Sequence, residues 1–257
     1  MKKREDIAKY LEEFLQWADS LGLKTLLNTG EVADSLGVPD YVDEFLKISL
    51  PLLEKHPHHK ILFLTKGGTP HIRILEKIPK NMRKHFIVSF SINPLPVARK
   101  YEKGAAKPLD RIMAAKKSEE MGFEVRIRID PIIPIEGWPF YYNDLIYKLC
   151  SELNPSRITI GSLRALKKTI KYAKDKSWLI YINRFSEKTT WGLRIEHKLR
   201  MKMFELIISI LRDNGYKGPI ALCKEPLRMW KELKEKGLLE DPGEKGIWEK
   251  VLCNCKL

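Results

Sequence analysis

Long apolar runs are missing from this sequence, and cysteine is scarce. None of its apolar stretches approaches the roughly 20 residues that span a bilayer. The N-terminal Met1-Lys2-Lys3-Arg4 is basic, but no apolar segment follows it, which argues against a secretory signal. The four cysteines do not form the dense framework of small secreted domains. These absences predict a cytoplasmic protein without membrane segments.

Several common site motifs are also absent. The sequence contains neither the glycine fingerprint of dinucleotide-binding proteins nor the glycine-lysine sequence of a phosphate loop. A nucleotide pocket of either type is therefore not expected. The segment His56-Pro57-His58-His59 has no carboxylate or cysteine at ligand spacing, so it predicts a solvated turn rather than a metal site.

Positive charge is in excess: 47 Lys and Arg residues face 33 Asp and Glu residues, for a formal net charge of +14. A basic surface attracts polyanions, because each phosphate contact releases a condensed counterion. We therefore expect a nucleic-acid partner. The alternative is thermal adaptation, in which many charges form surface networks. That alternative explains the number of charges better than their one-sided excess.

Basic residues gather after residue 164, with aromatic residues between them. Tyr172, Trp178 and Trp191 are interleaved with this charge, as on surfaces that stack bases while binding phosphates. Helical lysines that simply face water are the alternative explanation. The candidate nucleic-acid contacts are Lys167, Lys168, Lys171 and Trp191.

Apolar periodicity alternates between helix and strand along most of the chain. Helices are predicted over 7–20, 41–55, 109–121, 142–153 and 198–214, and strands over 23–28, 61–64, 86–90, 125–129, 158–160 and 219–223. Repeated strand–helix units with short connections predict an α/β fold with a parallel sheet, open or closed as a barrel.

The ends of the predicted strands carry polar residues. Ligands bind at the carboxyl ends of the strands in parallel sheets. Five polar ends in succession therefore predict one convergent site rather than five ordinary turns. The five segments are 28–31, 65–68, 89–93, 130–131 and 161–164.

One predicted strand alternates charged with apolar residues. Arg126, Arg128 and Asp130 share one face of this strand, because side chains alternate at period two. Buried parallel strands are usually plain apolar runs, so this face needs polar partners. An interior cavity that holds a charged ligand would supply them. An edge strand with one solvated face is the alternative.

In order and spacing, these strand ends resemble the spore photoproduct lyase group of radical S-adenosylmethionine (SAM) enzymes and its broader relatives. Thr29-Gly30-Glu31 is similar to the family's Gly-Gly-Glu motif, and Thr65-Lys66 to its lysine at the third strand end. The segment 90–93 is similar to its serine at the fourth strand end. Further similar segments are 102–106, 136–138 and 188–200, and 223–225 with 253–255 looks like the tail of the broader relatives.

The resemblance implies SAM as the cofactor. In the family the glutamate binds the methionine amino group of SAM, and the lysine and serine are associated with cofactor binding. Carried onto this sequence, the cofactor candidates are Asn28, Thr29, Gly30, Glu31, Lys66, Ser89, Ser91 and Asp130. We expect Glu31, Lys66 and Ser91 to converge in one pocket with the others.

One departure from the family concerns the iron–sulfur cluster. The family holds a 4Fe-4S cluster with three cysteines spaced C-x3-C-x2-C, and this sequence has no such triplet. The cluster is expected for the family, but its ligands are absent here. Either the chain lacks its first strand and cluster loop, which an upstream polypeptide would carry, or it is a relative that has lost the chemistry.

The resemblance also implies an architecture. We expect a partial TIM-type (β/α)6 parallel barrel of the radical SAM kind over residues 1–164, without its first strand and cluster loop. We expect a helical, basic C-terminal extension over residues 165–257, packed on the substrate side of the barrel.

The C-terminal cysteines are the candidate catalytic and metal-binding thiols. Cys253 and Cys255 are separated by one residue, so an extended segment points both sulfurs to one side. With Cys223 they could hold an auxiliary metal. They could also supply the hydrogen atom that a cysteine donates in the spore enzyme, at a place where this sequence has Glu31. Exposed redox-active thiols and inert packing are the alternatives. Arg164, the last residue of the fifth polar strand end, is the third catalytic candidate.

Two functions follow from these observations. The first is a radical SAM, lyase-like enzyme that acts on nucleic acid by 5′-deoxyadenosyl radical chemistry and is inactive as given without the C-x3-C-x2-C segment. The second is a non-catalytic nucleic-acid-binding module on a degenerate scaffold of the same kind.

Overall fold

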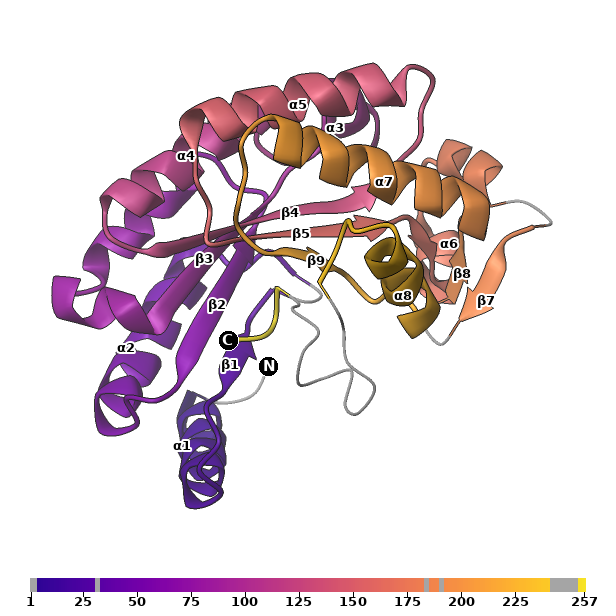
Figure 1. Cartoon of the computed structure of the whole chain (residues 1–257). Coiled ribbons are helices and arrows are strands. Elements are labelled where there is room, and N and C mark those ends of the chain that lie inside the picture. Colours follow the sequence, from indigo (N-terminus) through magenta and orange to yellow (C-terminus); the bar gives the residue numbers. More distant parts are fainter. Residues whose placement is uncertain (1–3, 31–32, 183–184, 190–191, 241–253) are drawn as a thin grey trace. The chain divides into compact units, whose positions relative to one another are not determined.

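The computed structural model describes residues 4–30, 33–182, 185–189, 192–240 and 254–257 (Figure 1). The strands of its main sheet are β1 (Leu26–Asn28), β2 (Lys60–Thr65), β3 (Phe86–Ser91), β4 (Glu124–Ile132), β5 (Arg157–Ser162) and β9 (Ile220–Leu222). They are ordered β1-β2-β3-β4-β5-β9, and β1–β2, β2–β3 and β5–β9 pair in parallel. Helices connect most of these strands, so the predicted α/β fold with a parallel sheet is confirmed.

Contacts divide the chain into two compact units, and β4 runs from the first into the second. The first unit comprises Met1–Ser91, Leu109–Arg126 and Cys255–Leu257. Besides β1, β2 and β3, its elements are α1 (Arg4–Ser20), α2 (Pro39–Lys55), the 3-10 helices η1 (His71–Lys77) and η2 (Lys80–His85), and most of α4 (Pro108–Glu120).

The helix α1 packs on α2 through one apolar face. Leu15 is fully buried against Ile48 and Leu52, and Ala8 and Leu11 pack beside it at helical spacing. Burying one leucine side chain in this way stabilises the fold by about 2 kcal/mol. The apolar residues whose spacing predicts this helix are therefore the same residues that pack it against α2.

The turn at His56-Pro57-His58-His59 differs from the solvated turn predicted. His59 is fully buried, with its Nδ1 2.8 Å from Thr25 Oγ1 and its Nε2 2.9 Å from Asp19 Oδ1. Asp19 Oδ2 also lies 2.6 Å from His56 Nδ1. The prediction was wrong for His59 because its carboxylate partner lies on α1, far away in the sequence.

The second unit comprises Ile92–Pro108 and Ile127–Asn254. Besides most of β4, β5 and β9, its elements are α3 (Leu95–Tyr101), α5 (Trp138–Glu152), β6 (Arg164–Ala165), α6 (Lys167–Tyr172), η3 (Ser177–Tyr181), β7 (Glu187–Thr189), β8 (Gly192–Arg194), α7 (His197–Asp213) and α8 (Leu227–Glu235). The three short strands form an antiparallel sheet in the order β6-β8-β7. In the part of the chain that the structure describes, no helix is long and apolar enough to cross a membrane.

The strand β4 carries its charged residues into the interior. Arg126, Arg128 and Asp130 are all buried, and β4 lies between β3 and β5 in the sheet. The edge-strand alternative is therefore wrong. The strand also continues beyond the predicted end at Ile129 and runs to Ile132. The polar partners that this face needs are groups of the protein itself.

Candidate functional site

The end of β1 forms a turn built around Gly30. Asn28 Oδ1 accepts a hydrogen bond from the Gly30 amide over 2.9 Å, and Thr29 Oγ1 lies 2.9 Å from Ser35 Oγ. A Cβ atom at Gly30 would come within 2.5 Å of the Leu64 Cβ, so the turn can approach β2 only because this residue is glycine. Three predicted cofactor residues therefore form one turn.

Asp34, which sequence reasoning missed, holds the end of β2. Its Oδ1 accepts a hydrogen bond from Thr65 Oγ1 over 2.8 Å, and its Oδ2 accepts one from the Lys66 backbone amide over 2.6 Å. The Gly67 amide in turn donates to Thr65 Oγ1 over 2.8 Å. Asp34 thus fixes the backbone that carries the half-buried Lys66 side chain.

The register of β2 and β3 places further predicted residues beside this turn. Thr65 pairs with Phe90, so Lys66 and Ser91 follow at adjacent strand ends. Ser89 and Ser91 are both buried in β3. The cofactor candidates of the first unit therefore lie at the carboxyl ends of three neighbouring strands, as expected for a ligand site in a parallel sheet.

Two cofactor candidates are not placed at this edge. Glu31 lies outside the described residues. Asp130 belongs to the second unit. Convergence of all the candidates in one pocket therefore stays a prediction.

The end of the chain, Cys255–Leu257, contacts the first unit. Asn28 Nδ2 donates a hydrogen bond to Cys255 Sγ over 3.1 Å. The buried Arg126 donates from its NH1 to the Lys256 carbonyl oxygen over 2.5 Å. A catalytic candidate, Cys255, therefore touches a cofactor candidate, Asn28.

In the second unit, Asp130 lies between two guanidinium groups. Its Oδ2 accepts hydrogen bonds from Arg128 NH2 over 2.6 Å and from Arg164 NH2 over 2.8 Å. Burial alone raises the pKa of Asp130, but the charges and hydrogen bonds of Arg164 and Arg128 outweigh burial and hold that pKa well below its usual range. Burial lowers the pKa of Arg164, and Asp130 more than reverses this. Asp130 and Arg164 therefore both stay charged.

Cys223 belongs to the same cluster. Arg128 NH2 lies 2.9 Å from Cys223 Sγ, and Arg164 NH1 donates to the Cys223 carbonyl oxygen over 3.2 Å. A Cβ atom at Gly161 would come within 2.5 Å of Asp130 Oδ1 and 3.1 Å of Cys223 Cβ, so glycine is required for this approach. The catalytic candidate Arg164 and the metal candidate Cys223 thus meet beyond the ends of β4, β5 and β9.

A second buried charge network, which sequence reasoning also missed, is centred on Glu225. Its Oε1 accepts hydrogen bonds from Ser162 Oγ and from Arg194 NH1, each over 2.7 Å. Arg200 on α7 pairs with both Glu225 and Glu187. Because Arg194 lies on β8 and Ser162 on β5, this network joins the antiparallel sheet and α7 to the end of a main-sheet strand.

The predicted metal ligands are only partly described. Among residues 4–30, 33–182, 185–189, 192–240 and 254–257, no group of three or more His, Cys, Asp or Glu residues is arranged to hold a metal ion. Cys150, Cys223 and Cys255 form no disulfide with one another. Cys253 lies outside the described residues, so the auxiliary site formed by Cys223, Cys253 and Cys255 stays a prediction.

The predicted nucleic-acid surface begins on the short helix α6. Lys167, Lys168 and Lys171 are all exposed there. The Lys171 ammonium lies 5.2 Å from the centroid of the Tyr172 ring, which is itself exposed. Trp191 lies outside the described residues. The helix therefore presents charge and an aromatic ring together, as binding of a polyanion with bases requires.

Consecutive parallel strands with polar carboxyl ends are typical of α/β enzymes built as full or partial barrels. A sequence model of the family described as spore photoproduct lyase matches residues 6–198. The chain therefore belongs to the spore photoproduct lyase family. No curated protein sequence matches the chain.

Solved structures of the same class share this fold. A spore photoproduct lyase complexed with dinucleoside spore photoproduct is 17% identical, with a TM-score of 0.70 over 86% of this chain and 67% of that chain. A variant lyase with bound AdoMet and dinucleoside spore photoproduct is 19% identical, with a TM-score of 0.70 over 85% of this chain and 66% of that chain. SuiB from Streptococcus suis, bound to S-adenosylmethionine, is 16% identical, with a TM-score of 0.53 over 89% of this chain and 45% of that chain.

These likenesses confirm the predicted partial barrel of the radical SAM kind. The chain spans about two thirds of the length of the spore photoproduct lyases that it matches. At these identities the comparison shows the fold, and the reaction is argued below from the residues of this chain. The boundary predicted between residues 164 and 165 stays a prediction.

Proposed function

We propose that the protein is a radical SAM enzyme that acts on nucleic acid. The observation that carries this proposal is the family match over residues 6–198, which includes the polar ends of β1 to β5. The net charge of +14 and the exposed lysines of α6 support a polyanionic substrate. A relative of the same fold holds a dinucleoside photoproduct, which supports a substrate of that chemical class.

SAM is the proposed cofactor. The ends of β1, β2 and β3 offer amide, ammonium and hydroxyl groups, which match the charged and ribose parts of SAM through charge-assisted hydrogen bonds. The residues proposed to hold it are Asn28, Thr29, Gly30, Glu31, Lys66, Ser89, Ser91 and Asp130. When bound beside a reduced iron–sulfur cluster, SAM would supply 5′-deoxyadenosyl radical chemistry at these residues.

Cys255, Cys253 and Arg164 are the proposed catalytic residues. Cys255 is the proposed hydrogen-atom donor, because its thiol contacts Asn28 at the cofactor edge of the first unit. Donation of the S–H hydrogen atom to a product radical leaves a thiyl radical on Cys255. A thiolate at Cys253, separated from it by one residue, can share this radical as a disulfide radical anion. Arg164 keeps its charge beside Asp130, so it offers a fixed cation for a substrate phosphate or a developing anion.

The cluster thiolates are proposed to come from another polypeptide segment. The sequence has no C-x3-C-x2-C triplet, and we propose that the 257-residue chain is inactive without one. The helix α1 offers a surface for that segment, since it exposes a second apolar stripe besides the one packed on α2. The stripe consists of Ile7, Tyr10, Phe14 and Trp17, and the exposed Leu21 follows it directly after the helix. Exposed apolar patches of this kind mark protein contacts.

Anaerobic reconstitution with iron and sulfide tests the enzyme. We expect the 257-residue chain to form 5′-deoxyadenosine from SAM only when a co-expressed segment with the C-x3-C-x2-C triplet is present. Replacing Trp17 with Glu should then lower this activity by weakening the contact of that segment with α1. Cleavage of SAM by the chain alone would contradict the proposal and point to Cys223, Cys253 and Cys255 as cluster ligands.

A non-catalytic nucleic-acid-binding module is the second candidate, because the sequence lacks the cluster triplet. Titration calorimetry with SAM separates the two functions. If the parent chain binds SAM and the Lys66→Ala variant does not, the result supports the enzyme. Tight binding of nucleic acid by a chain that binds no SAM supports the module instead.

A further inference from the structure

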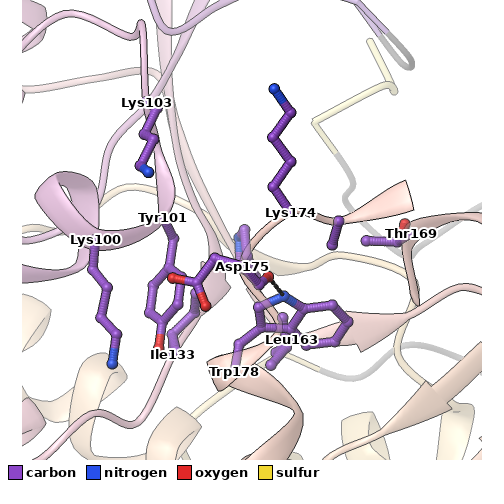
Figure 2. Close-up of a pocket in the computed structure, with 11 residues that line it drawn as sticks. Lys100, Tyr101, Lys103, Ile133, Leu163, Thr169, Lys174, Asp175 and Trp178 are labelled. Atoms are coloured by element: carbon purple, nitrogen blue, oxygen red, sulfur yellow. Dashed lines mark hydrogen bonds between the residues drawn. The ribbon is translucent and has the colours of Figure 1, made fainter. Parts of the chain in front are cut away.

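A cavity of about 430 Å³ lies beyond the ends of β4 and β5 in the second unit (Figure 2). Its lining includes Pro131 and Ile133, which follow Asp130, and Leu163, which precedes Arg164. Its volume falls within the range of about 300 to 1,000 Å³ that is typical of small-molecule sites. The cavity therefore adjoins the charged cluster of Asp130 and Arg164 along two strands.

The cavity has an excess of positive charge. Three lysines line it: Lys100, Lys103 and Lys174. Asp175 is the one carboxylate among its described lining residues. Hydrogen bonds from Ser177 lower the pKa of Asp175, and the charges of Lys100 and Lys103 lower it further, so this carboxylate stays ionised. One negative charge then faces three positive ones, which favours an anionic ligand.

Two aromatic rings, Tyr101 and Trp178, complete the lining. Trp178 is buried, and its Nε1 donates a hydrogen bond to the Asp175 backbone oxygen over 2.8 Å. Tyr101 OH lies 3.3 Å from Ser177 Oγ, and the Lys100 ammonium lies 5.2 Å from the Tyr101 ring centroid. Figure 2 shows Asp175 between the side chains of Tyr101 and Trp178. Rings beside ammonium groups are what a base with an attached phosphate requires.

The neighbouring helix α6 carries further positive charge outside the cavity. Thr169 of α6 lines the cavity, and Lys167, Lys168 and Lys171 are exposed on the same helix. A strand that places one nucleotide in the cavity therefore has further ammonium groups for its flanking phosphates. A small metabolite would make no use of them.

We propose that this cavity binds one nucleotide of a single-stranded nucleic acid, with its base against Tyr101 and Trp178 and its phosphates on Lys100, Lys103 and Lys174. The inference rests on the proposed function in taking nucleic acid as the substrate, and it names the place where that substrate is held. The nucleotide lies beside the predicted reaction site at Arg164, because Leu163 and Pro131 belong to both the cavity and the flanks of the Asp130–Arg164 pair.

The test is the binding of fluorescently labelled oligonucleotides to the 257-residue chain, measured by anisotropy over a range of salt concentrations. The probes are an oligothymidylate, its ribose counterpart and an abasic strand of equal length. The variants are Tyr101→Leu and the double variant Lys100→Ala with Lys103→Ala. The matched control replaces two exposed lysines of the first unit, Lys24 and Lys80, with Ala. Circular dichroism and Tm establish that each variant is folded.

Tyr101→Leu should weaken binding of the oligothymidylate by about tenfold, as expected for the loss of one stacking contact. It should leave the abasic strand unaffected. The double lysine variant should weaken every strand and flatten the log–log salt dependence by about two contacts. The control should change affinity by less than about twofold, since its lysines lie outside the cavity. The DNA and RNA probes show which sugar the cavity prefers.

Three other outcomes overturn the inference, and each has a different consequence for the proposed function. If the strands bind strongly and neither variant changes the affinity, the cavity is not the binding site, but nucleic acid remains the proposed substrate. If no strand binds the parent chain at low salt, both fail. If Tyr101→Leu weakens binding of SAM and leaves the oligothymidylate unaffected, the cavity belongs to the cofactor, and the inference is wrong while the proposed enzyme stands.

Discussion

The Asn28 side-chain amide donates a hydrogen bond to the Cys255 sulfur over 3.1 Å, so the end of the chain lies against the end of β1. The two residues stand at opposite ends of the sequence. Each is a site candidate for a different reason: Asn28 belongs to a polar strand end, and Cys255 to a pair of closely spaced thiols. Their contact ties the proposed hydrogen-atom donor to the proposed cofactor edge.

Replacing Asn28 with Ala should release this contact and expose the Cys255 thiol. We expect Cys255 to be alkylated several-fold faster in the variant, as measured by mass spectrometry of peptides after timed treatment with iodoacetamide. Cys150 on α5 is the internal control, because burial raises the pKa of its thiol and Asn28 does not contact it. Equal alkylation rates of Cys255 in both proteins would show that Asn28 does not hold the tail.

Replacing Asp130 with Asn should strongly destabilise the second unit. The change leaves the Arg128 and Arg164 guanidinium groups without their shared countercharge, which costs about 3 to 5 kcal/mol for a buried pair. Urea denaturation measures the free energy of unfolding. The matched control is Asp144→Asn, which breaks an exposed pair with Lys148 and should cost no more than about 0.5 kcal/mol. Similar losses in both variants would contradict a special role for Asp130.

Asp19 should make stability depend on acid pH. The hydrogen bond with His56 lowers the pKa of Asp19 below its ordinary value of 3.8, and contacts with His59 lower it further. Together they outweigh the opposing effect of desolvation. The stability that these contacts contribute is therefore fully present above pH 3.8 and is lost as pH falls through the lowered pKa. Thermal melts from pH 7 to pH 2 should show a steeper acid loss for the parent chain than for Asp19→Asn. Parallel curves would contradict this assignment.

The lysines of α6 should determine the salt dependence of nucleic-acid binding. Replacing Lys167, Lys168 and Lys171 with Ala should flatten the log–log slope by about two or three contacts, because each contact releases a counterion. Trp191→Ala should instead lower affinity at every salt concentration, since base stacking releases no counterion. Filter binding between low and high salt measures both effects. If no DNA or RNA binds at low salt, the basic excess reflects thermal adaptation.

Much of the fold could be predicted from the sequence. Apolar periodicity predicts α2, α7 and β3 to within a few residues, because each element buries one continuous apolar face. The order of the strands in the sheet follows from the regular alternation of strands with helices. The polar strand ends could also be predicted from the sequence, because polar residues there interrupt apolar runs.

The charged groups that organise the site were harder to predict. Asp34 is an acidic residue in a turn, and only the folded chain brings it to Thr65. Glu225 binds Arg194 and Arg200, and nothing local in the sequence distinguishes these arginines from exposed ones. His59 was misjudged for the same reason, because its partner Asp19 lies on another element. Pairing between distant charges leaves no periodic signal.

The parallel pairing of β9 with β5 sets the order in which the chain can fold. β5 ends at Ser162, whereas β9 begins only at Ile220, after β6, α6, β7, β8 and α7. Such a non-local pairing closes a long loop before it gains any contact, which makes folding slow. On the ribosome, the β5 edge therefore stays unpaired until the chain has emerged as far as β9. During that interval the β5 edge is open to mispairing, so a chaperone should raise the yield of folded protein.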